Sequence, residues 1–333
     1  MNILLSCVGR RSYMAEYFKK SLNGKGIVIG TNSEAFTSGM LACDKSFVVP
    51  PILDKDYIPT LLDIAIKENV SMIISLFDIN LPYLAKSKNM FAQHGITVVV
   101  SDEKVIDIAN DKWKTYSFLK ENNINTPLTF YKLHDALNAL KDNKLKYPLF
   151  LKPRWGMSSI GAIRVDNDEE MAFFYKNIQK QIKNSYLNDL TSGILEESVL
   201  IQEYIDGKEY GIDIFNNLNK KYFMSVSKEK LAMRSGETDA AIIVDIPELN
   251  TLAVKISNLL EHIGNLDIDV LFDGEKYYVL EMNARFGGGF PFSYLAGADL
   301  PSILIKMLKD ESVTPAPIKV GLKGVKSIEP VEI

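Results

Sequence analysis

Residues 281–289 read Glu-Met-Asn-Ala-Arg-Phe-Gly-Gly-Gly, and the first three of them end a predicted β-hairpin that spans 266–283. Two apolar runs of strand length flank the turn dipeptide Asp273-Gly274, which is a typical hairpin signal. Three residues of the hairpin, Asp269, Glu281 and Asn283, offer only oxygen ligands to a metal. Such ligands suit Mg²⁺ and are wrong for zinc. Burying them without a cation would be costly, so the hairpin predicts a metal site.

The register of this hairpin determines whether the oxygen ligands meet. A two-residue turn would point Asp269 away from Glu281. A three-residue turn that includes Glu275 would place Asp269 opposite Val279 and on the same side as Glu281, with Gly274 in a left-handed bulge position. The metal site therefore depends on the second register.

A lysine-bearing strand and a loop of small residues lie upstream. Residues 149–153 read as a strand that carries Lys152, and residues 154–161 read Arg-Trp-Gly-Met-Ser-Ser-Ile-Gly. Small residues let backbone N–H groups approach phosphate oxygens, while the ammonium supplies charge. The loop is not a Walker A loop, because no Gly-Lys-Ser/Thr opens a helix. The alternative is a flexible turn without a ligand.

A second polar hairpin is predicted over residues 201–213, around Asp206-Gly207. Its acids, Glu203, Glu209 and Asp213, carry more charge than a buried hairpin tolerates without partners. Either they face a ligand or they are solvated on an edge strand.

The first third of the chain alternates β-branched runs with helical stretches, which predicts a parallel sheet covered by helices. The expected strands are 3–5, 27–29, 46–49, 72–76 and 97–100, and the clearest helices are 13–22 and 57–68. Ligands bind at the carboxyl ends of such strands. A dinucleotide site is disfavoured, because Gly9 stands alone where the fingerprint needs three glycines.

Three charged residues follow strands of this sheet and are candidate substrate ligands. Arg10 and Arg11 precede a helix and could hold an anionic group, since guanidinium donors and the helix dipole act together. Solvated surface charge is the alternative. Asp78 could hold a substrate ammonium or could cap the helix that begins near Asn80.

Beyond residue 105 the expected helices are 105–109, 112–122, 135–142 and 168–184, and the later strands have hairpin turns. The fold class is therefore an α/β domain followed by α+β material, divided as 1–107, 108–200 and 201–333.

The composition excludes several classes of protein. The 333 residues contain 38 Lys and Arg against 42 Asp and Glu, with no block of like charge, so a nucleic acid partner is not expected. The apolar runs are too short for a membrane span, and the first residues do not resemble a secretory signal. Cys7 and Cys43 are too few for a disulfide framework. We expect a cytoplasmic protein.

The motifs at 149–161, 201–213 and 281–289, with Asp111-Lys112 at the head of a helix, resemble the ATP-grasp superfamily. The chain looks closest to its carbamoyl-phosphate-synthase-like and amino acid ligase branch. The resemblance implies a Rossmann-like first domain, a small lid domain and an antiparallel core that clasps ATP against the lid.

The resemblance also implies nucleotide contacts. Lys112 and Lys152 would contact the phosphates of ATP, and Glu209 would hold the ribose hydroxyls. Backbone groups that read the adenine edge would be those of Glu203, Tyr204 and Ile205. The flap over the phosphates would contain Gly156, Ser158, Ser159 and Gly161.

For catalysis, the resemblance implies that Asp269, Glu281 and Asn283 hold Mg²⁺ or Mn²⁺. Arg285 and Lys152 would stabilise the transferring phosphoryl group. Lys228 and Arg234 fall where relatives place cations near the γ-phosphate or substrate. Gly287 and Gly288, with Arg10, Arg11 and Asp78, would border the substrate. Asp269 is a small departure, since several relatives have Glu or Gln there.

The expected function is an ATP-dependent carboxylate–amine ligase that forms an acyl phosphate and releases ADP and phosphate. A carboxylate is a poor electrophile, and its activation asks the protein mainly for positioning and charge neutralisation. The alternatives are an ATP-dependent carboxylase or carbamoyl-phosphate-forming relative and an ATP-binding sensor without catalysis. Homodimers are common in the superfamily. The expected partners are small molecules, a carboxylate and an amine.

Overall fold

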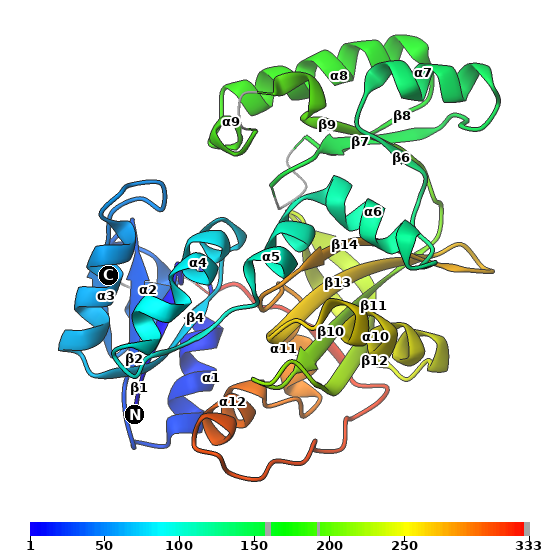
Figure 1. Ribbon diagram of the computed structural model, residues 1–333. Coiled ribbons are helices and arrows are strands. Elements are labelled where there is room, and N and C mark those ends of the chain that lie inside the picture. The colour runs from blue at the N-terminus through cyan, green and yellow to red at the C-terminus, as the bar shows by residue number, and fades with distance from the viewer. Residues whose placement is uncertain (157–160, 192–193, 330–333) are drawn as a thin grey trace.

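The computed structural model describes residues 1–156, 161–191 and 194–329 (Figure 1). The first domain contains a five-stranded parallel sheet with the order β3-β2-β1-β4-β5. Its strands are β1 (Asn2–Ser6), β2 (Val28–Asn32), β3 (Lys45–Val48), β4 (Val70–Ser75) and β5 (Thr97–Val99). Its helices are α1 (Ser12–Leu22), α2 (Ser38–Ala42), α3 (Tyr57–Lys67), the short 3-10 turn η1 (Asp78–Asn80) and α4 (Leu81–Ala92). The predicted parallel sheet is confirmed, and its strand order changes direction between β1 and β4, where such folds bind ligands.

Two helices lead from this domain into the rest of the chain. They are α5 (Glu103–Asn110) and α6 (Lys112–Glu121), and both contact β14 of the core sheet. The apolar side chains of α5 and α6 belong to one buried cluster that also contains Leu4 of the first domain and Ile268 of the core. The first domain and the core therefore share a continuous hydrophobic core.

The lid is a four-stranded antiparallel sheet with the order β6-β9-β7-β8, seen at the top of Figure 1. Its strands are β6 (Thr129–Phe130), β7 (Leu149–Pro153), β8 (Ile163–Val165) and β9 (Val199–Glu203). Its helices are α7 (Leu133–Lys141), α8 (Asp168–Lys183), α9 (Leu187–Leu190) and the 3-10 turn η2 (Leu195–Glu197). The boundary proposed at residue 200 falls inside β9, which pairs with β7 over its whole length.

The core is a six-stranded sheet with the order β14-β13-β10-β11-β12-β15. Its strands are β10 (Lys208–Asn216), β11 (Tyr222–Arg234), β12 (Glu237–Val244), β13 (Gly264–Phe272), β14 (Tyr277–Asn283) and β15 (Lys323–Val325). Its helices are α10 (Pro247–Leu260), α11 (Phe290–Leu295) and α12 (Leu300–Leu308). The predicted combination of a parallel first sheet and later antiparallel sheets is confirmed.

The two faces of the core sheet differ in chemistry because side chains alternate along each strand. Ile212 on β10 and Ile268 on β13 are paired and buried on one face, within the cluster that also contains residues of α10. Asp213 and Asp267 are likewise paired, on the opposite face. That polar face carries the candidate site.

The hairpin register differs from both registers considered for β13 and β14. The turn has four residues, 273–276, so that Phe272 pairs with Tyr277, and Gly274 has a φ of +102°. A bulge at Leu280 then shifts the register, and Asp269 pairs directly with Glu281. The expected pairing of Asp269 with Val279 is therefore wrong.

The bulge has a physical reason. Val279 and Met282 are both fully buried in the apolar cluster, although they are three residues apart and a regular strand would point them to opposite faces. The extra residue lets both remain in the core and turns Glu281 onto the polar face. The carboxylates thus lie on one side, as the sequence predicted, by a different route.

Within the described part of the chain, no helix has the length and apolar character that a bilayer crossing requires.

Candidate active site

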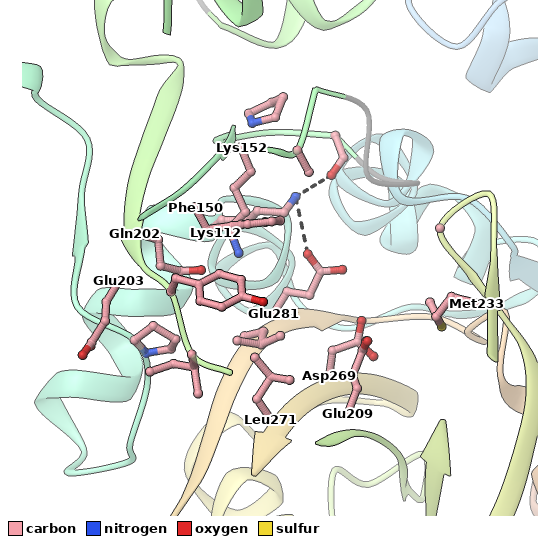
Figure 2. Close-up of a pocket in the computed structure, with 18 of the residues that line it drawn as sticks. Lys112, Phe150, Lys152, Gln202, Glu203, Glu209, Met233, Asp269, Leu271 and Glu281 are labelled. Atoms are coloured by element: carbon pink, nitrogen blue, oxygen red, sulfur yellow. Dashed lines mark hydrogen bonds and ion pairs between the residues drawn. The ribbon is translucent and has the colours of Figure 1, made fainter. Parts of the chain in front are cut away.

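A cavity of about 480 Å³ lies between the lid and the polar face of the core sheet (Figure 2). Its lid wall includes Phe150, Lys152 and Gln202, and its core wall includes Asp269 and Glu281. The size of the cavity and its mixture of apolar and charged walls are typical of a small-molecule site.

Lys112 lies at the first position of α6, and its ammonium points into this cavity (Figure 2). Lys112 Nζ donates to the Gly156 carbonyl at 2.5 Å and lies 3.8 Å from Glu281 Oε2. The helix start is fixed by its N-cap residue Asp111, which accepts hydrogen bonds from Arg154 at 2.8 and 2.7 Å. Because Arg154 directly follows β7, this ion pair also joins the lid to the core.

Lys152 enters the same cavity from β7 and is 8% exposed. Burial lowers the pKa of Lys152 to about 8, although Glu281 works in the opposite direction. Burial would raise the pKa of Glu281, but Lys112 and Lys152 outweigh it and hold that pKa below its usual value. Two lysines therefore face one buried carboxylate, an arrangement that favours the binding of further negative charge.

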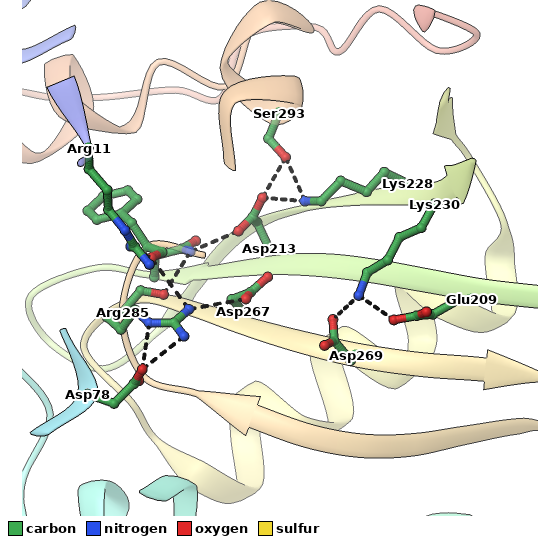
Figure 3. Close-up of polar contacts among 12 residues, drawn as sticks. Arg11, Asp78, Glu209, Asp213, Lys228, Lys230, Asp267, Asp269, Arg285 and Ser293 are labelled. Carbon is green, nitrogen blue, oxygen red and sulfur yellow. Dashed lines mark hydrogen bonds and ion pairs between the residues drawn. The ribbon is translucent and has the colours of Figure 1, made fainter. Parts of the chain in front are cut away.

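Lys230 is a buried cation behind two carboxylates of the cavity wall, and our sequence reasoning missed it. Lys230 Nζ lies 2.6 Å from Glu209 Oε1 and 2.6 Å from Asp269 Oδ1 (Figure 3). Burial would lower the pKa of Lys230, but the two carboxylates raise it above its usual value. The available signal was the spacing of Lys230 from Lys228, since residues two apart on a strand share a face.

Lys228 lies elsewhere. Its side chain is fully buried, and Nζ lies 2.5 Å from Asp213 Oδ2 and 3.1 Å from Ser293 Oγ (Figure 3). Lys228 does not line the cavity, so its position does not support the expected nucleotide contact. Arg234, another expected cation, is half-exposed near the tip of the β11–β12 hairpin and pairs with Asp239 at 3.0 Å.

The oxygen ligands predicted for a metal lie along β13 and β14. Asp269 and Glu281 are direct cross-strand partners that line the cavity, and Asn283 is two residues further on the same face, outside the lining of the cavity. Among the described residues, no three His, Cys, Asp or Glu side chains gather into a metal site of their own. Two carboxylates and an amide instead fit Mg²⁺ that takes its other ligands from water and substrate phosphates.

The opposite end of the cavity is formed by backbone and apolar groups. Residues 203–205 line it beside Leu271 and Leu280. Glu203 is held by Leu128: its carboxylate accepts a hydrogen bond from the Leu128 backbone N–H at 3.1 Å, and its own backbone N–H donates to the Leu128 carbonyl at 2.8 Å. Gly156 also lines the cavity, whereas Gly161 does not; the predicted flap residues Ser158 and Ser159 lie outside the described residues.

Arg285 is held by two carboxylates from distant parts of the chain (Figure 3). Asp78 Oδ2, in the first domain, accepts from Arg285 Nε at 3.1 Å and from Nη2 at 3.0 Å. Asp267 Oδ2 accepts from Nη1 at 3.2 Å. We call Arg285, together with Asp78 and Asp267, the Arg285 clamp. A Cβ on Gly287 would lie 2.1 Å from Asp267 Oδ2, so only glycine fits beside the clamp. Asp78 therefore pairs with an arginine in the protein, a contact that the sequence did not reveal.

The remaining candidate substrate residues lie beside this clamp. Arg11 donates from its guanidinium to the Phe286 carbonyl, and Arg10 is exposed. A Cβ on Gly288 would lie 3.0 Å from the Glu237 carboxyl carbon. Arg11 and Gly287 are thus brought to the Arg285 clamp, at the junction of the first domain with the core.

Comparison with known protein families shows which family has this fold and this set of residues. A model of the ATP-grasp domain matches residues 109–289, which is more than half of the chain. The chain belongs to the ATP-grasp family. A second model, described as the N-terminal domain of PylC-like proteins, matches residues 3–99.

Curated relatives of this ATP-grasp chain include a carbamoyl phosphate synthase large chain and a glutamate ligase. The chain is 23% identical over 331 residues to the carbamoyl phosphate synthase large chain of Clostridium acetobutylicum. The aligned region covers 94% of this chain and 28% of the relative. The chain is 26% identical over 195 residues to the coenzyme gamma-F420-2:alpha-L-glutamate ligase of Methanocaldococcus jannaschii, covering 55% of this chain and 61% of that ligase. The chain thus spans only a little over a quarter of the carbamoyl phosphate synthase large chain.

Solved structures share the fold at low identity. The biotin carboxylase domain of Hydrogenobacter thermophilus 2-oxoglutarate carboxylase, solved with MgADP and bicarbonate, has a TM-score of 0.75 and 16% identity, covering 96% of this chain and 72% of that one. The L-amino acid ligase from Bacillus licheniformis has a TM-score of 0.66 and 20% identity, covering 95% of this chain and 75% of that one.

Proposed function

We propose that this ATP-grasp chain is a ligase that activates a small carboxylate with ATP and joins it to an amine. The observation that carries the proposal is the single cavity in which Lys112 and Lys152 face Glu281 and Asp269. Phosphoryl transfer needs positioning and charge neutralisation more than an activated side chain, and this arrangement supplies both. Two of the similar proteins are an L-amino acid ligase and a glutamate ligase, and this supports the same reaction class.

In this proposal the nucleotide spans the cavity from its apolar end to its charged end. The backbone of residues 203–205 would contact adenine, and Glu209 would hold the ribose. Lys112 and Lys152 would contact the phosphates. All of these residues line the same cavity, which supports this assignment.

Asp269, Glu281 and Asn283 would hold one or two Mg²⁺ ions, with Mn²⁺ as a substitute. Bound there, the cation would neutralise charge on the phosphate oxygens. Lys230 would remain beside Asp269 and Glu209, and it would add positive charge near the same phosphates.

The carboxylate would lie at the Arg285 clamp, with Arg10, Arg11 and the backbone of Gly287 and Gly288 around it. The guanidinium groups would orient the anion and stabilise charge on the acyl phosphate. A homodimer is a further part of the proposal, supported by the Hydrogenobacter thermophilus structure, which is a biotin carboxylase domain dimer.

The proposed reaction has two steps. A carboxylate oxygen attacks the γ-phosphorus of ATP, an O–P bond forms, the bond to ADP breaks, and an acyl phosphate results. The amine nitrogen then attacks the acyl carbon, a C–N bond forms, and the C–O bond to phosphate breaks. An ammonium substrate loses two protons in this step; one leaves on the phosphate as HPO₄²⁻ and the other is released.

Phosphate release from Mg-ATP tests the proposal, measured with small carboxylates and amino acids singly and in pairs with amines. Release that requires one acid and one amine is the expected result. Release with bicarbonate in the absence of an amine would favour a carboxylase instead. ATP binding without release for any pair would contradict the ligase and favour a sensor.

Nucleotide binding is expected to take up protons just above pH 8. The pKa of Lys152 is about 8 in the free chain, so part of its population is neutral there. Phosphate anions favour the ammonium form, raise that pKa and draw in up to about one proton per site. Calorimetry of Mg-ADP binding in two buffers of different ionisation enthalpy measures this uptake. Lys152→Met should abolish it and Lys146→Met, at an exposed lid position, should not; equal uptake in both variants would contradict the assignment.

A further inference from the structure

Arg154 lies at the junction between the lid and the core, two residues after Lys152 of β7. Its backbone N–H donates to the Ser198 carbonyl at 2.8 Å, which holds Arg154 in the lid beside β9. Its own carbonyl accepts a hydrogen bond from the backbone N–H of Lys112 at 3.2 Å, at the start of α6. Helix α6 lies between the lid and the core sheet (Figure 1). The backbone of Arg154 is therefore connected to both lysines assigned to the nucleotide phosphates.

The side chain of Arg154 makes this connection a second time. Its Nε and Nη2 donate to Asp111 Oδ1 and Oδ2 at 2.8 and 2.7 Å, so the ion pair is bidentate. The exposed fractions of the two side chains are only 11% and 6%. Two parallel hydrogen bonds between planar groups fix orientation as well as distance, and a lysine cannot form them. Because desolvation offsets most of the attraction in a buried ion pair, we expect the main effect of this pair to be geometric.

Aromatic rings restrict the guanidinium group of Arg154 further. The guanidinium carbon lies 4.5 Å from the centroid of the Trp155 ring and 5.5 Å from that of the Tyr131 ring. The centroid of the Tyr131 ring lies in turn 4.5 Å from that of Trp113, which is on α6. Rings from both sides of the junction thus lie beside the ion pair, and the attraction between cation and ring favours the observed position of the guanidinium.

The position of Asp111 determines that of Lys112, the next residue. Asp111 Oδ1, which accepts from Arg154 Nε, also accepts from the backbone N–H of Trp113 at 2.9 Å and so caps α6. Lys112 Nζ donates to the carbonyl of Gly156, two residues after Arg154, at 2.5 Å. A shift of Arg154 relative to α6 would therefore separate Lys112 from the lid.

We propose that Arg154 is a positioning residue, which holds Lys112 of the core and Lys152 of the lid at one fixed separation, so that both contact the phosphates of the same nucleotide. This inference rests on the nucleotide orientation in the proposed function. Arg154 itself is outside the lining of the cavity, so it acts through the two lysines. Its loss should weaken the contacts to phosphate and leave those to adenine and ribose, which residues 203–205 and Glu209 supply.

Asp111→Asn breaks this ion pair with little other change. Asparagine keeps an oxygen for the helix cap, but its amide NH₂ faces Arg154 Nη2, where two donors meet. We expect Mg-ADP to bind this variant about tenfold more weakly than wild type, because part of a charge-assisted hydrogen bond to phosphate is lost. Adenosine, which has no phosphate, should bind the variant and the wild type with equal affinity. Calorimetry measures the Mg-ADP affinity, and ligand-observed NMR measures the adenosine affinity.

Asp107→Asn is the matched control. Asp107 also accepts two hydrogen bonds from one cation, Lys114, at 2.6 and 2.7 Å, but it is exposed on α5 and outside the lining of the nucleotide cavity. This variant should bind both ligands as the wild type does. Equal Mg-ADP affinity in Asp111→Asn and Asp107→Asn would overturn the inference. An equal loss of Mg-ADP and adenosine affinity in Asp111→Asn would also overturn it, because a lid that is merely destabilised gives that result.

A double-mutant cycle tests whether Arg154 acts through Lys112. Arg154→Lys keeps the charge but not the bidentate pair, and it replaces Asp111→Asn if that variant does not fold. In the wild-type background Arg154→Lys should weaken Mg-ADP binding. In the Lys112→Met background it should weaken binding much less, because the lysine that it positions is absent. Effects of the two substitutions that simply add would contradict the inference.

The outcomes separate this inference from the proposed function. If an acid and an amine support phosphate release and Asp111→Asn binds Mg-ADP as the wild type does, the ligase function stands and the role of Arg154 is wrong. If Asp111→Asn loses Mg-ADP affinity and keeps adenosine affinity, but no acid and amine pair supports phosphate release, the role of Arg154 stands and the ligase function is wrong.

Discussion

Replacing Glu281 by glutamine is expected to reduce phosphate release by about a hundredfold to a thousandfold, the usual effect of removing one preorganised charged group from a transition state. Glutamine keeps the size of the side chain but removes the charge that faces Lys112 and Lys152. It also removes one of the two carboxylates that we propose to hold Mg²⁺. The rate should recover little when Mn²⁺ replaces Mg²⁺, because the positions of the lysines are affected as well as the metal.

Glu275→Gln is the matched control for this experiment. Glu275 lies in the exposed turn of the same hairpin, and the substitution makes the same chemical change away from the cavity. We expect an unchanged rate of phosphate release. A Glu281→Gln variant that keeps the wild-type rate would remove Glu281 from the proposed catalytic machinery.

The second large effect is on stability. Lys228→Met is expected to lower the free energy of unfolding by about 3 to 5 kcal/mol, because it leaves the buried Asp213 carboxylate without its cation. The comparison is Lys67→Met, which breaks a Lys–Asp pair of almost the same length, 2.6 Å, on the exposed surface of α3. That change should cost less than about 1 kcal/mol, because water screens exposed pairs.

Urea unfolding of both variants, with the slope of the transition checked against wild type, measures the difference. Similar midpoints for Lys228→Met and Lys67→Met would show that burial of the Lys228 pair adds no stability. A loss of nucleotide affinity in Lys228→Met without a loss of stability would restore to Lys228 the nucleotide role that the resemblance implied.

Elements with strong local signals were predictable from the sequence. The β-branched runs of the first domain became β1 to β5, and the Asp111-Lys112 helix start is present as the N-cap of α6. These features depend on side-chain periodicity and local capping, which are properties of short segments.

The hairpin register was not predictable in this way. The bulge at Leu280 exists because Val279 and Met282 both pack into a cluster formed by distant elements. A turn dipeptide carries no information about that packing. The sequence therefore predicted that Asp269 and Glu281 share a face but not the pairing that brings them together.

The roles of the lysines on β11 also depend on distant residues. Lys228 and Lys230 share one face of the sheet, and the sequence alone does not distinguish them. Lys228 lies beneath α11 and meets Asp213, whereas Lys230 meets Asp269. The contact of Asp78 with Arg285 joins residues that are 207 positions apart in the chain, and it became visible only in the folded structure.

The central claim is that a carboxylate oxygen of the substrate attacks ATP. Its most direct test uses ¹⁸O in the carboxylate of an acid that supports phosphate release. Mass spectrometry of the released phosphate should then find one ¹⁸O atom in each molecule, because the C–O bond of the acyl phosphate breaks when the amine attacks. Phosphate that contains no ¹⁸O, with all of the label retained in the acid or its product, would contradict an acyl phosphate and with it the proposed ligase mechanism.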